Sequence, residues 1–156
     1  MHALSSVAVF PRRERRGAAP GARFGVRLTP AEALQLSLRL DLVRLFNARN
    51  GLTIAQFLGG GPTALGYGLP DTRALSPSSS ADLECWERVI TRAILLYETR
   101  LRQVQVRVTQ DAARPAVARV RIAATAAGAD GAGAGAGALD AGFDATFDDV
   151  LPHAGA

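Results

Sequence analysis

The sequence predicts a small α+β domain in which two main helices pack on a small three-stranded antiparallel sheet. Two features of its apolar residues support this fold class. Up to about Tyr97 they recur at helical spacing, and from Val104 onward they alternate with polar residues at strand spacing. The length of 156 residues is the third observation, because it suits one domain with one core.

The first predicted helix begins after Thr29 and ends near Arg49. Thr29 and Glu32 have the spacing of a capping box, and Pro30 occupies the first helical position, where proline is tolerated. We expect its apolar stripe to be substantially buried: Leu34, Leu36, Leu38, Leu40, Leu42, Val43, Leu45 and Phe46. The pair Asn50-Gly51 is expected to end this helix in a left-handed conformation.

A short helix over 52–58 and a long loop are predicted to lead to the second main helix. Tyr67 and Leu69 give the loop apolar side chains to bury, so we expect its middle to be pinned against the core. The second main helix is predicted from about Ser80, as its N-cap, to about Tyr97.

Three strands are predicted after the helices. Val104, Val106 and Val108 alternate with polar residues in the first strand, and the second has the same pattern over 118–122. Residues 124–138 are rich in Ala and Gly and predict a flexible loop. The third strand is predicted over 143–148, with an acidic outer face that complements three arginines of the other strands: Arg107, Arg119 and Arg121.

Composition and charge indicate where the chain acts. All 18 basic residues are arginine, which is typical of biased genomic base composition, so the high isoelectric point does not by itself indicate a polyanionic partner. Residues 1–27 hold six arginines without apolar periodicity and predict a flexible arm before a single domain over 28–152. The single cysteine, Cys85, excludes an internal disulfide. We expect a soluble cytoplasmic protein with no membrane insertion and no specific nucleic-acid partner.

The residue types that most catalytic and metal sites require are missing from the predicted core. Both histidines, His2 and His153, lie in predicted tails, which leaves no Ser-His-Asp or Cys-His arrangement and no ligand set for zinc. The glycine run 59–61 lacks the lysine of a phosphate-binding loop. We therefore expect no catalytic residue, no metal, no cofactor and no small-molecule substrate.

Paired carboxylates provide the one enzymatic alternative, a lysozyme-like glycosidase that cleaves peptidoglycan. Glu84 and Glu87 are spaced i, i+3 on the second main helix, and glycoside cleavage needs two carboxyl groups. A solvated helix face explains this pair better. Glu98 lies beside the cation Arg100, which favours its charged form and is the wrong setting for a general acid.

The junction of helix and strand carries Tyr97-Glu98-Thr99-Arg100-Leu101. From spacing alone, Glu98 and Arg100 are either an exposed ion pair or a charged knuckle that meets a partner. Three other segments accompany this motif in order: Leu45-Phe46-Asn47-Ala48-Arg49, Tyr67-Gly68-Leu69-Pro70-Asp71 and Phe143-Asp144-Ala145-Thr146-Phe147-Asp148. Together they resemble the type VI secretion baseplate subunit TssE and the related phage tail baseplate wedge proteins, the GPW-like lysozyme-related family, over 28–123 and 139–151. Thr99 stands where that family has Pro, and Ala48 where it has Thr.

This resemblance implies a non-enzymatic structural subunit of a contractile-injection baseplate wedge. Such a subunit binds other wedge subunits and links the baseplate to the contractile sheath by strand addition. The residues that the resemblance implies as partner contacts lie in the first three motifs: Asn47, Arg49, Tyr67, Asp71, Glu98, Arg100 and Leu101.

Overall fold

The computed structural model describes residues 27–127, 137–145 and 150–153. The predicted N-terminal arm therefore lies outside the described residues, except for Arg27. In chain order the elements are α1 (Pro30–Asn47), α2 (Ile54–Gly59), the 3-10 helix η1 (Ala64–Gly66), α3 (Ser80–Tyr97), β1 (Leu101–Gln110), β2 (Ala118–Ala126), β3 (Gly137–Ala145) and β4 (Val150–Pro152). The α+β class is as predicted.

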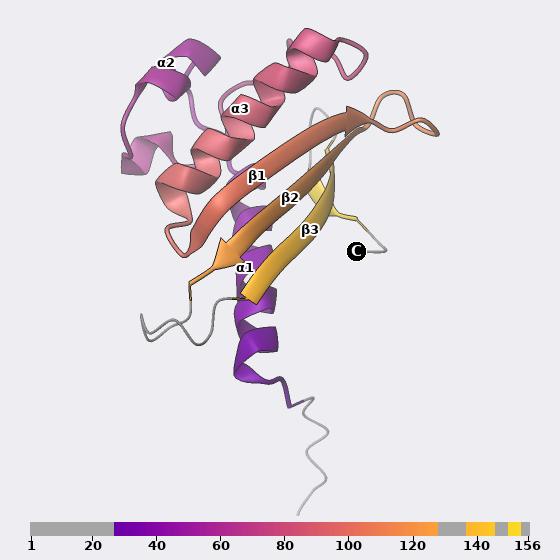
Figure 1. The fold of residues 1–156 in the computed structure, drawn as a ribbon. Helices are drawn as coiled ribbons and strands as arrows, with labels where there is room; N and C mark the ends of the chain where they lie inside the picture. Colours follow the sequence, from indigo (N-terminus) through magenta and orange to yellow (C-terminus); the bar gives the residue numbers. More distant parts are fainter. Residues whose placement is uncertain (1–26, 128–136, 146–149, 154–156) are drawn as a thin grey trace, which may run out of the picture.

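The strands form one antiparallel sheet in the order β1-β2-β3-β4, which is one strand more than predicted (Figure 1). β3 ends at Ala145, residues 146–148 of the third predicted strand lie outside the described residues, and β4 follows as a short fourth strand. The predicted loop 124–138 is also strand at both ends, because β2 continues to Ala126 and β3 begins at Gly137. Residues 128–136 of that loop lie outside the described residues.

β3 begins earlier than predicted because buried and exposed residues already alternate in a segment where several side chains are small. Leu139, Ala141 and Phe143 are buried, whereas Ala138 and Asp140, which precede the first two of them, are exposed. Two alanines in this pattern give a weak period-two signal, which the Ala/Gly composition of the segment concealed.

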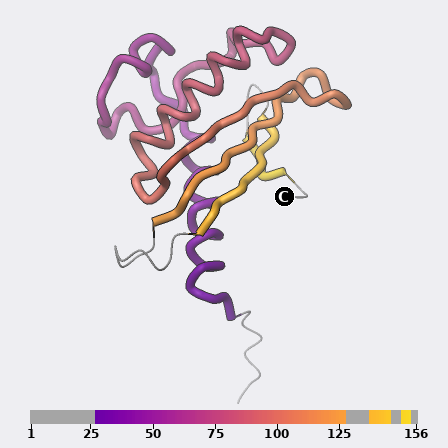
Figure 2. The backbone as a smooth tube through the Cα atoms, viewed as in Figure 1, coloured from indigo at the N-terminus to yellow at the C-terminus, as the bar shows by residue number. Residues whose placement is uncertain are grey.

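Helices α1 and α3 lie on one face of the sheet (Figures 1 and 2). α3 runs along β1, and α1 contacts β3 and β4. Between the layers Phe46 of α1 meets Phe143 of β3 edge to face, with ring centroids 5.4 Å apart. The opposite face of the sheet carries the exposed polar residues of the strands.

The predicted pairing with acids of the third strand is confirmed for Arg119, whereas Arg121 pairs with an aspartate that precedes the predicted strand. Arg121 is 2.8 Å from Asp140 and Arg119 is 3.9 Å from Asp144. Arg107 instead approaches a residue of α3, Glu87, at 3.8 Å. The third arginine differs because β1 is an edge strand and does not neighbour the acidic strand β3.

Helix α1 begins as predicted, but its burial and its end differ. The side chain of Thr29 accepts from Glu32 N, and the carboxylate of Glu32 accepts from Thr29 N, which completes the capping box. Leu36 and Leu40 are 48% and 49% exposed, because they lie on the side of α1 opposite the core. The helix stops at Asn47, and Gly68 rather than Gly51 is the described glycine with positive φ.

The turn between β1 and β2 is held by the buried carboxylate of Asp111. It accepts from Ala113 N at 2.9 Å and lies 2.9 Å and 2.8 Å from the guanidinium groups of Arg114 and Arg119. The hydrogen bond from Ala113 and the guanidinium of Arg114 lower the pKa of Asp111 from 3.8 to about 2.

We expect acid to weaken the fold through this carboxylate. Because the folded-state pKa of Asp111 is depressed from 3.8 to about 2, the unfolded chain binds the additional proton between those values. The free energy of unfolding therefore falls as the pH drops through this window. Urea denaturation at a series of pH values is expected to give a flatter dependence in this window for D111N than for the wild type. Equal slopes for the two proteins would contradict this role of Asp111.

Candidate functional site

The candidate site is the corner where α3 turns into β1. Glu98 caps α3, and its N–H donates to Ile94 O at 2.8 Å. Leu101 N then donates to Glu98 O at 3.1 Å, which closes a tight turn around Thr99. Leu101 is buried and starts β1. Backbone hydrogen bonds and one buried side chain thus fix the corner without a Gly or Pro.

Glu98 and Arg100 form a two-pronged ion pair inside this turn. Arg100 Nε lies 2.7 Å from Glu98 Oε1, and Arg100 Nη2 lies 2.6 Å from Glu98 Oε2. The Glu98 side chain is 9% exposed, so the interpretation as an exposed surface pair does not fit it. The hydrogen bonds that Arg100 donates to Glu98, followed by the one to Asp41, raise the pKa of Arg100.

Arg100 also ties the corner to the first helix. Its Nη2 lies 2.7 Å from Asp41 Oδ2, and its Nη1 lies 3.3 Å from Ser37 Oγ. The hydrogen bond from Arg100 lowers the pKa of Asp41. Asp41 is not among the predicted site residues, although its position in the sequence carries a signal. Asp41 directly precedes the buried Leu42, at the border of the apolar stripe, where a carboxylate needs a polar partner.

A pocket of about 320 Å³ opens at the corner, lined by Asp41, Leu45, Tyr67, Tyr97, Glu98, Thr99 and Arg100. The rings of Tyr67 and Tyr97 pack edge to face with centroids 5.4 Å apart. Tyr97 Oη donates to Thr63 O at 3.0 Å, which attaches the loop to α3. The pocket therefore combines a fixed charged group with aromatic walls, a composition that suits protein docking.

The loop that carries Tyr67 is joined to the end of α1 by backbone hydrogen bonds. Leu69 N donates to Ala48 O at 2.9 Å, and Asn50 N donates to Leu69 O at 3.0 Å. The amide of Asn50 also donates to Gly68 O at 3.1 Å. Asn50 therefore anchors the loop instead of ending α1 in a left-handed turn. The pinning of the loop is confirmed for the buried Leu69, while Tyr67 stays 41% exposed.

The structure gathers some of the residues implied as partner contacts and separates others. Tyr67, Glu98 and Arg100 meet at the pocket, and Leu101 is buried at the start of β1. The remaining three do not line the pocket.

Asn47, Arg49 and Asp71 make local contacts of their own. Asn47 Nδ2 donates to Val150 O at 2.9 Å, and Asn47 Oδ1 accepts from Val150 N at 2.8 Å, which holds β4. Arg49 donates to Phe46 O. Asp71 pairs with Arg73 at 2.8 Å, and this guanidinium lowers the pKa of Asp71 to about 2.

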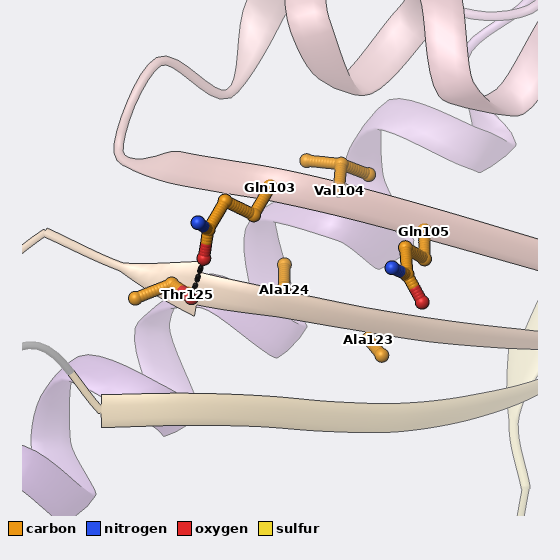
Figure 3. A pocket seen from close by; sticks show the side chains of 6 residues that line it. All are labelled: Gln103, Val104, Gln105, Ala123, Ala124 and Thr125. Atoms are coloured by element: carbon orange, nitrogen blue, oxygen red, sulfur yellow. Dashed lines mark hydrogen bonds between the residues drawn. The ribbon is translucent and has the colours of Figure 1, made fainter.

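A second depression, of about 570 Å³, lies on β1 and β2 (Figure 3). Its lining consists of Gln103, Val104, Gln105, Ala123, Ala124 and Thr125. Gln103 has a φ of 50°, at the irregularity of β1, and accepts from Thr125 Oγ1 at 3.1 Å. This lining has no titratable side chain and offers hydrogen bonds rather than acid–base chemistry.

The carboxylates considered for glycoside cleavage are placed differently from one another. Glu87 accepts from Val108 N at 2.8 Å, Glu84 is exposed, and Glu98 is bound by Arg100.

In the described ranges, no group of three or more His, Cys, Asp or Glu residues is placed to hold a metal ion. Nor does any described helix have the length and apolarity needed to cross a membrane.

Comparison with known proteins gives one family and one similar structure. The model of a family described as baseplate wedge protein gp25 matches residues 32–130. A chain from a solved structure, "The baseplate complex from the type VI secretion system", has the same fold with a TM-score of 0.53. The two chains are 19% identical, and the similarity covers 74% of this chain and 97% of that one. No curated protein matches the sequence significantly.

Proposed function

Because this chain belongs to the baseplate wedge protein gp25 family, we propose that it is a structural subunit of a type VI secretion baseplate wedge. The similar fold of a chain from such a baseplate complex supports this choice of machine. In this role the subunit binds other wedge subunits, and an extended segment of the contractile sheath adds to its sheet as a further strand. In this proposal the protein is not an enzyme, and it acts in the cytoplasm.

The observation that carries the proposal is the corner at the start of β1. Arg100 binds Glu98 and Asp41 together, so these three side chains give the pocket a defined shape without a partner. A preformed site binds at a lower entropic cost than one that has to be ordered. Tyr67, 41% exposed, supplies an aromatic contact surface at its wall.

The implied contact residues have different parts in this proposal. Glu98 is too buried to meet a partner and acts by holding Arg100, whose side chain is 38% exposed. Leu101 supports the corner from within the core. We assign direct but weaker contacts to three residues at exposed positions of the other two motifs: Asn47, Arg49 and Asp71.

Thr99 offers the sharpest test of corner docking. It is exposed, lines the pocket and contributes no side-chain hydrogen bond to the described corner network, so a larger side chain obstructs a partner without breaking the fold. We expect Thr99→Trp to reduce wedge subunits recovered with the tagged chain about tenfold, the loss that 1.4 kcal/mol of binding free energy gives. Recovery from native cells is measured by quantitative mass spectrometry, with the melting temperature unchanged.

Ala116→Trp is the matched control, because Ala116 is exposed in the turn at the far end of β1. Ten strand residues place this turn about 33 Å from the corner. The control is expected to recover wedge subunits at the wild-type level. Equal recovery from both tryptophan variants would reject the corner as the docking site.

A further inference from the structure

The outer edge of β3 is occupied by hydrogen bonds. Three successive outward carbonyl groups accept: Ala138 O from Gln35 Nε2 at 3.3 Å, Asp140 O from Arg39 Nη2 at 3.1 Å and Gly142 O from His153 N at 2.9 Å. Beyond them, β4 pairs with the end of β3. Gln35 and Arg39 come from α1, so the first helix and the last strand together close this edge to an added strand.

The outer edge of β1 is different. Asp111 N, just past the strand, bonds across to Val117 O at 3.0 Å, whereas Val108 N points away from β2 and donates to Glu87 Oε1 at 2.8 Å. The backbone N–H and C=O groups of successive residues point to opposite edges of a strand. The groups of β1 that point outward, away from β2, are therefore those of Val106, Val108 and Gln110. Within the described part of the chain, Glu87 makes the sole hydrogen bond to these groups.

Glu87 and Arg107 enclose this edge from its two sides. Glu87 comes from α3 on the helical face, and the 78% exposed side chain of Arg107 comes from the open face to within 3.8 Å of Glu87 Oε1. A charged side chain on an edge N–H keeps other strands from pairing there. This contact is also reversible, because an exposed ion pair is weak.

We propose that β1 is the edge that receives the added strand, and that Glu87 with Arg107 guards this edge until the partner arrives. The inference rests on the proposed strand addition and names its place. β1 carries two arginines, Arg102 and Arg107, and no carboxylate. The partner segment is therefore extended, with apolar side chains that continue the valine face and acidic side chains toward the arginines. While Glu87 occupies the Val108 N–H, a second copy of β1 is also kept from pairing at this edge.

The test compares proline at outward positions of the two edges. Val106→Pro removes an outward N–H of β1 and leaves the ladder with β2 intact, since proline is tolerated at such edge positions. Ala138→Pro is the matched change at the closed edge. Particles are purified from native cells through a tag on this chain, and sheath and wedge subunits are quantified by mass spectrometry. We expect Val106→Pro to lower the sheath-to-wedge ratio about tenfold, as the loss of edge hydrogen bonds implies, and Ala138→Pro to leave it unchanged.

The outcomes separate the edge from strand addition itself. If only the Ala138→Pro variant loses sheath subunits, the choice of β1 is overturned, but strand addition itself still stands. Full sheath recovery from both variants would overturn strand addition, while the wedge subunits in the same samples report independently on corner docking. Gln110→Pro, at an exposed outward position, repeats the test if Val106→Pro fails to fold.

The guarding of the β1 edge by Glu87 with Arg107 can be tested separately in the isolated protein. Glu87→Ala frees the Val108 N–H and is expected to increase self-association, measured by light scattering after size exclusion. Glu87→Gln keeps an oxygen acceptor for that N–H and is expected to stay at the wild-type mass. A Glu87→Ala protein with the wild-type mass and an unchanged exchange rate of the Val108 amide with deuterium would overturn the guard.

Discussion

Replacing Gly68 with alanine is expected to destabilise the fold by about 3 kcal/mol or more, through backbone strain and overpacking. Gly68 has a φ of 103°, a conformation that residues with a side chain rarely adopt. An alanine Cβ would also lie 2.4 Å from Ala48 O, far inside contact distance. That oxygen cannot retreat freely, because it accepts the hydrogen bond from Leu69 N. The variant has to separate the loop from the end of α1.

Gly61→Ala is the control for this experiment. A Cβ at Gly61 meets nothing within 4 Å, and the residue has no positive φ. We expect its free energy of unfolding to stay within about 0.5 kcal/mol of the wild type, as for most surface changes. Urea denaturation measures both variants. Similar stability of the two would show that the contact between the loop and α1 contributes little.

Arg100→Ala is expected to cost about 2–3 kcal/mol, mainly because it leaves the Glu98 carboxylate buried without a partner. The Glu98 side chain is only 9% exposed and loses both hydrogen bonds to the guanidinium. Asp41 loses its link to the corner at the same time. The cost stays below that of a wholly buried pair, because Arg100 and Asp41 are 38% and 34% exposed.

Two further variants distinguish burial and geometry from charge alone. Arg73→Ala breaks the ion pair between Arg73 and Asp71, whose side chains are 75% and 54% exposed. We expect it to lower the free energy of unfolding by less than about 1 kcal/mol. Arg100→Lys keeps the charge but loses the two-pronged geometry, so its stability should fall between those of Arg100→Ala and the wild type. If Arg100→Ala loses no more than Arg73→Ala in urea denaturation, the corner is not held by this ion pair.

Features set by neighbours in sequence could be predicted, and those set by distant neighbours could not. The capping box of α1 lies within four residues and was fully foreseeable from Thr29 and Glu32. The alternation of β2 likewise predicts its buried and exposed sides. The end of α1 was missed because Asn50 bonds to a loop whose glycine lies 18 residues further along the chain.

The same distinction applies to the candidate site. Glu98 and Arg100 are two residues apart, so their pairing could be anticipated, but the burial of Glu98 depends on the packing of helices and sheet. Asp41 lies 59 residues from Arg100, and no local pattern connects the two. The motif 97–101 was thus enough to locate the corner. Its charged partner on α1, Asp41, could be identified only once the fold was known.

The bonds between Asn47 and Val150 also determine when this protein can finish folding during its synthesis. They join residues 103 positions apart, so α1 leaves the ribosome long before the strand that it holds has been made. At the usual speed of translation, about 5–20 residues per second, this delay lasts about 5–20 s. During these seconds the apolar side of α1, with Leu38 and Leu42, lacks the strands that later cover it. The nascent chain is therefore most exposed to aggregation, and most in need of chaperones, before its last strand emerges.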